Sequence, residues 1–253
     1  MQKLSVIIPC YNEESNIAEC LKSVSWADEV IAVDSFSTDD TARICRDLGA
    51  RVLQHEYVSP SAQKNWAIPQ ASHVWALLLD ADERVSDGLC EEIQGILRAD
   101  GPLDGYWVKR QNYFVGKRIR FCGWQNDWVL RLFRRDLGRY GEERVHESLI
   151  VQGEVARCRH PLIHYPYRSV EDELVKIRRY GLWAAADKFE AGKRAGGWQL
   201  FFHSAYRFLN AYFFRGGFLD GKHGLVLCLF EAFGVFFKYA KLWEMGLEGK
   251  RSE

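Results

Sequence analysis

The sequence predicts an α/β protein in which a mostly parallel sheet with flanking helices is followed by an antiparallel extension and a C-terminal helical region. Three observations lead to this class. Strand and helix patterns alternate as far as Leu97, strand patterns then follow one another without helices as far as Cys158, and helical patterns fill the chain from Ser169 onward. Parallel strands joined by helices form sheets that are covered on both faces.

The parallel part contains four short apolar runs of the kind that form buried strands. They are Leu4–Pro9, Glu29–Asp34, Arg51–Leu53 and Val74–Leu79. Helical spacing of apolar residues separates these runs, and Gly49 is expected to lie just beyond the end of the second helix as its C-cap. A further helix, predicted over Asp87–Leu97, follows the fourth strand.

The middle of the chain carries strand patterns that short turns connect, which favours antiparallel pairing. These strands are predicted over Tyr106–Val115, Arg118–Phe121, Val129–Arg134 and Leu149–Cys158, with turns at Gly116 and Gly153. The helical region breaks at 192–197 and at 215–224. We therefore expect two domains, a sheet domain over 1–167 and a helical domain over 168–253.

Composition limits the class of protein. Lys+Arg and Asp+Glu both number 34, so the formal net charge is zero and no attraction of the whole molecule to nucleic acid is expected. The seven cysteines include no C-x-x-C pair and are expected to be reduced thiols of a cytoplasmic protein. No signal peptide is expected, and the longest apolar run, Gly224–Phe237, is interrupted by Glu231 and short for a membrane span.

Four polar segments fall at the carboxyl edge of the predicted sheet, where open α/β sheets bind ligands. They are Cys10–Glu14, Asp34-Ser35, Lys64-Asn65 and Asp80-Ala81-Asp82. In extended backbone the two aspartates of this D-x-D would project to one side. Such hard oxygen ligands suit Mg²⁺ or Mn²⁺ holding a diphosphate. The spacing alone leaves open that these acids only cap the strand and start the next helix.

Taken in order, the motifs resemble those of the inverting family-two glycosyltransferases with the GT-A fold. The motifs are S-V-I-I-P-x-Y-N-E-E from Ser5, V-D-S-x-S-x-D-x-T from Val33, K-N at Lys64 and L-L-L-D-A-D-E from Leu77. Within this family the sequence is most similar to the bacterial lipopolysaccharide-core β-glucosyltransferases. The segments that carry this closer resemblance are Trp124, Arg131–Arg134, Val145–Glu147 and Arg215–Gly221.

The resemblance implies an inverting transfer of a hexose, with glucose the best guess, from a UDP-sugar to a lipopolysaccharide-core or other glycolipid acceptor. It also implies that a divalent metal, Mg²⁺ or Mn²⁺, assists departure of the diphosphate. The resemblance implies that Pro9, Tyr11 and Glu13 line the nucleotide pocket and that Asp34 accepts a hydrogen bond from uracil or ribose. It also implies that Lys64 lies near the base or the diphosphate, that Asp80 holds the ribose and that Asp82 binds the metal. A turn-capping role for Asp34 and a solvated helix face for Lys64 remain open.

Inversion requires a general base on the face of the anomeric carbon opposite the departing diphosphate. The candidates for this base are Glu142, Glu143 and Glu147. Glu147 is the predicted base because it directly precedes a strand-like segment, whereas Glu142 and Glu143 are expected in a turn beside Gly141. His146 is either a further metal or phosphate ligand or a histidine that is hydrogen-bonded in place.

Aromatic residues suggest where an acceptor and a membrane would bind. Trp107, Tyr113, Phe114, Trp124 and Trp128 form either a platform for sugar rings or ordinary core. The segments Trp198–Phe214 and Gly224–Trp243 are apolar on nearly every face, in a region with 14 Lys+Arg against 10 Asp+Glu from residue 168 onward. This pattern predicts peripheral contact with the inner face of the cell membrane. The alternative is a packed helical lid.

Rival functions differ at the first strand. A nicotinamide dehydrogenase would need G-x-G-x-x-G there, and a sugar-phosphate nucleotidyltransferase would need a glycine-rich phosphate loop, but Cys10–Glu14 contains no glycine. A catalytically silent, membrane-bound scaffold of the same fold is the non-enzymatic alternative, which the intact Asp80 and Asp82 disfavour.

Overall fold

A computed structural model describes residues 2–99, 101–141 and 148–251. The chain divides into two compact units. The sheet unit comprises Met1–Gln111 and Asp127–His164, and the helical unit comprises Asn112–Asn126 and Tyr165–Glu253. The segment Asn112–Asn126 thus belongs with the C-terminal helices although it lies in the middle of the sequence.

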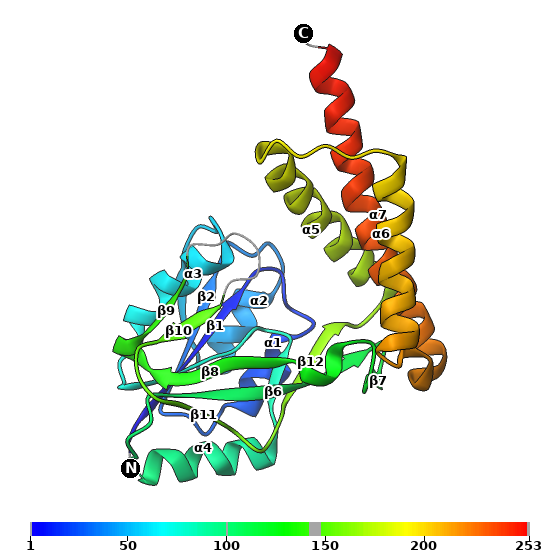
Figure 1. The fold of residues 1–253 in the computed structure, drawn as a ribbon. Helices are drawn as coiled ribbons and strands as arrows, with labels where there is room; N and C mark the ends of the chain where they lie inside the picture. The colour runs from blue at the N-terminus through cyan, green and yellow to red at the C-terminus, as the bar shows by residue number, and fades with distance from the viewer. Residues whose placement is uncertain (1, 100, 142–147, 252–253) are drawn as a thin grey trace. The chain divides into compact units, whose positions relative to one another are not determined.

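The sheet unit is built on the four predicted parallel strands. They are β1 (Leu4–Cys10), β2 (Glu29–Asp34), β3 (Arg51–Gln54) and β4 (Trp75–Leu78), in the spatial order β3-β2-β1-β4. Figure 1 shows β1 and β2 side by side within this sheet. The central strands β1 and β4 are buried along almost their whole length, which is why they read as continuous apolar runs rather than alternating ones. The predicted parallel core is confirmed.

The sheet continues with antiparallel strands. β8 (Trp128–Arg134) pairs with β4, and β6 (Gly105–Phe114) pairs with β8, both antiparallel as predicted. The stretch predicted as strand over 149–158 divides at the predicted Gly153 turn (φ +149°) into two short strands. Of these, β10 (Leu149–Val151) pairs with β9 (Gly138–Tyr140), and β11 (Val155–Arg157) pairs with β6 in the parallel direction.

Two more differences from the predicted strands involve partners that are distant in the sequence. β5 (Glu83–Val85) and β12 (Leu162–Tyr167) pair antiparallel. The sequence does not predict β5, because two of its three residues are charged. The strand expected over 118–121 is reduced to β7 (Lys117–Arg118). Within the helical unit, the backbone N–H groups of Arg120 and Phe121 donate to the Asp220 carboxylate instead of to a neighbouring strand.

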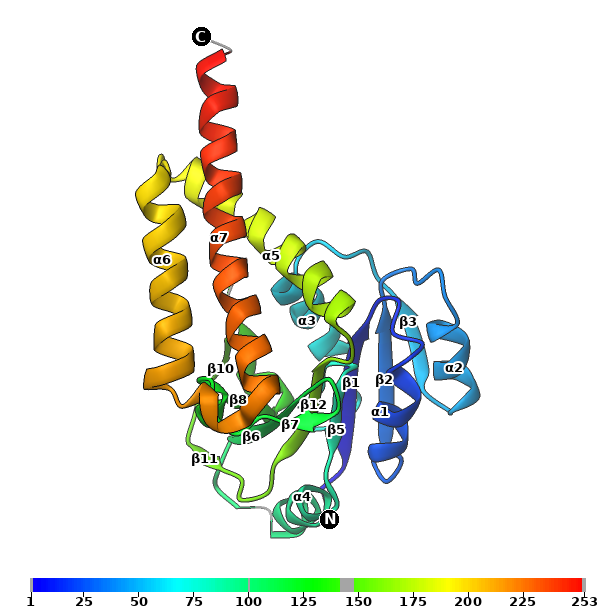
Figure 2. The same ribbon diagram turned by 90° about the vertical axis from the view of Figure 1, so that its right-hand side faces the viewer.

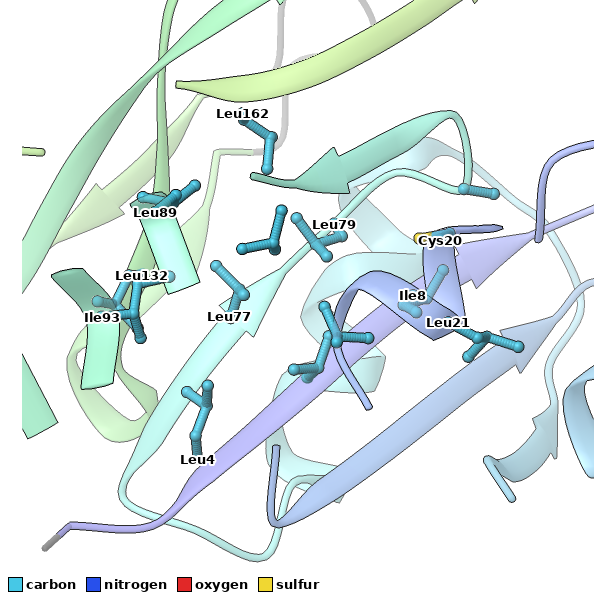
Figure 3. Packing of buried hydrophobic residues seen from close by; sticks show 14 of the residues in the cluster. Leu4, Ile8, Cys20, Leu21, Leu77, Leu79, Leu89, Ile93, Leu132 and Leu162 are labelled. Atoms are coloured by element: carbon cyan, nitrogen blue, oxygen red, sulfur yellow. The ribbon is translucent and has the colours of Figure 1, made fainter. Parts of the chain in front are cut away.

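Helices cover both faces of the sheet. They are α1 (Ile17–Ser23), α2 (Thr41–Asp47), α3 (Pro60–Ala67) and α4 (Asp87–Ala99). Alternate residues of β1 face opposite sides. Leu4 and Ile8 pack with Leu89 and Ile93 of α4 in one cluster (Figure 3), whereas Ile7 belongs to a second cluster that includes Ala67 of α3. The mixed α/β class, with its helical C-terminal region, is confirmed.

The helical unit consists mainly of three helices. α5 (Val170–Glu190) begins at a capping box formed by Ser169 and Asp172, and α7 (Gly221–Arg251) packs against both α5 and α6 (Gly197–Leu209) (Figure 2). A π-helical turn (Asn210–Phe214) and a 3₁₀ turn (Gly217–Asp220) connect α6 to α7. None of the helices in the described ranges is both long and apolar enough to cross a membrane.

A buried carboxyl group lies inside the helical unit. Glu173 of α5 is only 4 % exposed, and its oxygen Oε2 has no hydrogen-bond partner. Burial, reinforced by the charge of Glu231, raises the pKa of Glu173 to about 7, although Tyr167 donates to the carboxyl and Lys176 attracts it. The folded protein therefore holds this proton more tightly than the unfolded chain, in which the pKa is near 4.5.

The substitution Glu173→Gln should therefore remove a pH dependence of stability. In wild type, the stabilisation that comes from the bound proton is complete below about pH 4.5 and is lost as the pH rises through about 7, a loss of about 3 kcal/mol. The variant should match wild type in mild acid and be more stable in mild alkali, as measured by urea unfolding followed by circular dichroism. Glu190→Gln, at the exposed end of the same helix, is the matched control. An unchanged pH profile in Glu173→Gln would contradict the assignment.

Candidate active site

The segments after β1 and β2 hold each other through backbone-to-side-chain hydrogen bonds. Asn12, in the left-handed conformation (φ +53°), accepts from the Thr38 N–H at 2.8 Å and donates its own N–H to Ser37 Oγ at 2.9 Å. The Glu13 N–H donates to Thr41 Oγ1 at 2.7 Å. The first two sequence motifs therefore form one connected structure at the carboxyl edge of the sheet.

Asp34 ends β2 and is fully buried. Both of its carboxylate oxygens lie 3.2 Å from the Ser37 N–H, and Gln54 Nε2 donates at 3.4 Å. These contacts match the turn-capping role that the sequence left open. A hydrogen bond from a nucleotide to Asp34 stays a prediction.

The other residues predicted for the nucleotide pocket lie at the same edge. Pro9 is partly buried within β1, and Tyr11 follows the strand with 54 % of its surface exposed. The Glu13 carboxylate accepts from Asn16 Nδ2 at 2.7 Å. Among these residues, Tyr11 offers the largest accessible apolar surface for a ligand.

The D-x-D segment is a turn, so the expectation of extended backbone is wrong. The Glu83 N–H donates to the Asp80 carbonyl at 2.9 Å, and the Asp80 N–H donates to Glu83 Oε2 at 3.0 Å. The two aspartates then have different neighbours. Asp80 pairs with Arg131, whereas Asp82 Oδ1 lies 3.6 Å from His164 Nε2 on β12.

Arg131 of β8 is the centre of a buried charge network. Its guanidinium contacts the Asp80 carboxylate and lies 2.6 Å from Glu83 Oε1, and Glu83 is fully buried. Arg110 approaches the same Glu83 oxygen at 3.5 Å and forms a bidentate pair with Asp127, at 2.9 and 2.8 Å. Ion pairs thus join the turn after β4 to Arg110 of β6 and Arg131 of β8.

Lys64 of α3 adds a third cation beside Asp80. Its Nζ lies 3.5 Å from Asp80 Oδ1 and 5.1 Å from the centre of the Tyr140 ring, and the residue is buried rather than on a solvated helix face. Burial alone would raise the pKa of Asp80, but the charges of Arg131, Lys64 and Arg110 outweigh it and hold that pKa well below its usual range. Asp80 is therefore ionised.

A cavity of about 190 Å³ opens beside this network. It is lined by Lys64, Asp80, Trp107, Arg110, Trp128, Val129, Leu130, Arg131, Tyr140, Ser148 and Leu149. The Trp128 ring also has two cationic neighbours, Arg157 at 4.8 Å and Lys109 at 5.9 Å. Trp107 and Trp128 are thus the two members of the predicted aromatic set at this cavity. The others, Tyr113, Phe114 and Trp124, belong to the helical unit, where Phe114 is core.

A metal would find a partial ligand set here. The described ranges contain no group of three or more His, Cys, Asp or Glu side chains arranged to hold an ion. Asp82 and His164, each less than 15 % exposed, offer a carboxylate and an imidazole close together. This pair fits a cation that takes its remaining ligands from phosphate oxygens and water. His146 lies outside the described residues, as do Glu142, Glu143 and Glu147.

Sequence reasoning missed four residues of this network: Glu83, Arg110, Arg131 and His164. A signal for Arg131 exists, because it interrupts the otherwise apolar stretch Val129–Phe133. A charge within such a stretch is buried with its neighbours and therefore needs a partner. Nothing in the local sequence identifies His164, because its partner Asp82 comes from a distant strand end.

Comparison with known proteins gives consistent matches. Residues 5–148 match the family model for glycosyl transferase family 2. The lipopolysaccharide core biosynthesis glycosyltransferase LpsC of Rhizobium meliloti is 31 % identical, over 95 % of this chain and 92 % of that protein. An uncharacterized glycosyltransferase of Rickettsia typhi is 30 % identical, over 99 % and 90 %. Among solved structures, S. aureus TarS 1–349 in complex with UDP aligns with a TM-score of 0.48 at 17 % identity, over 98 % of this chain and 92 % of that one.

The network predicts the outcome of removing its central charge. Arg131→Leu should destabilise the protein by about 3–5 kcal/mol, because it leaves Glu83 and Asp80 without their principal counter-charge. The measurement is the free energy of unfolding in urea. Arg139→Leu, at an exposed position on β9, is the control and should change stability by less than about 0.5 kcal/mol. Equal effects of the two substitutions would show that the Arg131 network does not stabilise the fold.

Proposed function

The chain belongs to glycosyl transferase family 2 and is a glycosyltransferase, and from this premise we propose that it transfers a hexose from a UDP-sugar to a glycolipid acceptor with inversion. Glucose is our best assignment for the hexose, and the lipopolysaccharide core is our best assignment for the acceptor. The assignment of the acceptor rests on the similarity to LpsC along nearly the whole chain. Family membership also disfavours the nucleotidyltransferase alternative.

The donor is proposed to bind along the carboxyl edge of β1, β2 and β4. Pro9, Tyr11, Glu13 and Asp34 would hold the nucleoside, and ionised Asp80 would accept a hydrogen bond from the ribose. The buried position of Lys64 supports a role beyond surface charge, because its Nζ lies within 3.5 Å of Asp80. Lys64 would offset negative charge on a diphosphate bound beside the turn.

A divalent cation, Mg²⁺ or Mn²⁺, is proposed to be held by Asp82, with His164 as its companion from β12. When bound, it would neutralise charge on the departing diphosphate. The 3.6 Å separation of Asp82 and His164 supports this pairing. His146 remains a predicted further ligand on sequence grounds.

The acceptor sugar is proposed to occupy the cavity beside Trp107 and Trp128. At about 190 Å³ the cavity is smaller than the ~300–1,000 Å³ of whole ligand pockets, which suits one ring rather than a nucleotide sugar. Ser148, the neighbour of Glu147 in sequence, lines this cavity. Glu147 would take the proton of the acceptor hydroxyl as that oxygen attacks the anomeric carbon and the bond to the diphosphate breaks.

A glycolipid acceptor places the enzyme at a membrane surface, and we propose a peripheral position on the inner face of the cell membrane. The exposed aromatic residues of the helical unit support this. Trp198 and Phe201 of α6 are 66 % and 67 % exposed, and Phe214 in the following turn is 83 % exposed. Aromatic side chains of this kind suit the boundary between head groups and acyl chains.

Asp82→Asn should reduce transfer a hundredfold or more, which corresponds to about 3–4 kcal/mol of transition-state stabilisation, and should leave the fold intact. Transfer from UDP-glucose and the enhancement of UDP affinity by Mn²⁺ are measured together, and both should fall. Asp87→Asn, which removes an exposed carboxylate at the start of α4, is the control. Transfer within tenfold of wild type would exclude the metal role of Asp82.

Glu147→Gln should lower turnover by about 10²–10⁴-fold and leave UDP affinity close to wild type. The reason is that a general base acts on the acceptor hydroxyl and not on the nucleotide. Single-turnover kinetics with saturating donor, together with UDP titration calorimetry, separate the two effects. If Glu147→Gln turns over normally and Glu143→Gln does not, Glu143 is the base.

A further inference from the structure

A second cavity, of about 320 Å³, lies in the helical unit where the turn between α5 and α6 meets α7. It is lined by Lys188, Lys193, Arg194, Gln199, Tyr239 and Leu242. Half of these residues are cations, and none of them has a part in the proposed transfer reaction. The proposed transfer reaction therefore does not account for the cationic lining of this cavity.

Among the described residues, no acidic side chain pairs with the cations around this cavity. Lys188 and Lys238 both approach the Tyr239 ring, with their Nζ atoms 5.8 and 4.9 Å from its centre. Arg194 Nη1 donates only to backbone carbonyls, at 3.0 and 3.4 Å. Within the part of the chain that the structure describes, no carboxylate forms an ion pair with Lys188, Lys193, Arg194 or Lys238.

Like charges lie close together beside this cavity. The pKa of Lys238 is lowered, first by burial and then by the charges of Lys188 and Arg207. Repulsion of this kind is relieved when an anion binds among the cations. The geometry and charge of the cavity thus favour a negatively charged ligand with several oxygen acceptors.

The same part of α6 presents an apolar surface next to the cavity. Gln199 lines the cavity, while its neighbours Trp198 and Phe201 are exposed. The Trp198 ring stacks on Phe202, with 3.5 Å between ring centres, and Tyr206 continues the exposed surface one turn further along the helix. An anion site and an aromatic surface therefore share the first turns of one helix. A lipid, with a charged head group and apolar chains, matches both.

We propose that this cavity binds the phosphomonoester head group of a membrane lipid while the aromatic residues of α6 enter the lipid interface. A phosphomonoester carries up to two negative charges near neutral pH, because its second pKa is about 6, whereas a diester carries one. Several unpaired cations around one cavity therefore favour the monoester. The choice of a lipid as ligand rests on the proposed membrane position of the enzyme, but the anion site does not.

The test is sedimentation of the full chain with vesicles of phosphatidylcholine alone, with added phosphatidylglycerol, or with added phosphatidic acid at equal surface charge. Wild type should bind the phosphatidic acid vesicles most tightly. The double variant Lys193→Gln/Arg194→Gln should bind them roughly tenfold or more weakly, since each basic residue near an anionic surface contributes about 1 kcal/mol. Both residues are exposed, so the fold should survive, which circular dichroism checks.

Arg118→Gln/Lys222→Gln is the matched control, because it removes two exposed cations of the helical unit that do not line the cavity. It should lower binding to both anionic vesicles equally and keep the preference for phosphatidic acid. Equal binding of wild type to phosphatidic acid and phosphatidylglycerol would overturn the proposal, as would equal effects of the two double variants.

Soluble glycerol 3-phosphate separates a lipid from a free phosphate. If it binds vesicle-free protein as tightly as phosphatidic acid vesicles do, the lipid assignment is overturned. Hydrolysis of UDP-glucose without vesicles is measured in parallel, and the Lys193→Gln/Arg194→Gln variant should keep it. If wild type shows no preference for phosphatidic acid but hydrolyses UDP-glucose normally, this inference alone is refuted. If wild type shows the lipid preference but neither hydrolysis nor transfer, the proposed reaction alone is refuted.

Discussion

The contact of the Arg131 guanidinium with Asp80 and Glu83, between which it is buried, is the interaction on which the geometry of the carboxyl edge of the sheet depends. It joins the antiparallel strand β8 to the turn that follows the last parallel strand. An arginine in such a position must keep its counter-charges, because a buried and unpaired guanidinium is far less stable than a paired one. The position of the turn is therefore fixed both by its covalent connection to strand β4 and by its ion pairs with Arg131 of β8.

This arrangement explains how two acids with nearly adjacent positions acquire different environments. Asp80 is surrounded by Arg131, Lys64 and Arg110, which keep it ionised, while Asp82 lies on the other side of the turn with His164. A group that remains charged in a partly enclosed site can orient a polar substrate without reorganising. The different roles proposed for the two aspartates, Asp80 at the ribose and Asp82 at the metal, thus have a physical basis in the turn.

The charged groups of the helical unit are arranged differently from the paired charges around Arg131. Its interior contains the buried acid Glu173, whose proton the fold retains, and its α5–α6 end contains cations that form no ion pair with a carboxylate of the described residues. The first feature is internal and affects stability, whereas the second is accessible and is the proposed lipid site. Both are local excesses of one sign of charge in a chain whose net charge is zero. Composition alone therefore conceals them.

The sequence by itself determined the α/β class, the four parallel strands, the turn glycines Gly49 and Gly153, and the family, because these follow from local periodicity and contiguous motifs. Only the tertiary structure decided that Asp80–Glu83 is a turn, that β11 pairs with β6 in the parallel direction, and that Lys64 is buried. It alone brought Arg131 to Asp80 and His164 to Asp82, residues 51 and 82 positions apart. The physical reason is that ion pairs between distant strands leave no periodic trace in either segment: each charge is explained only by a partner that folding brings to it.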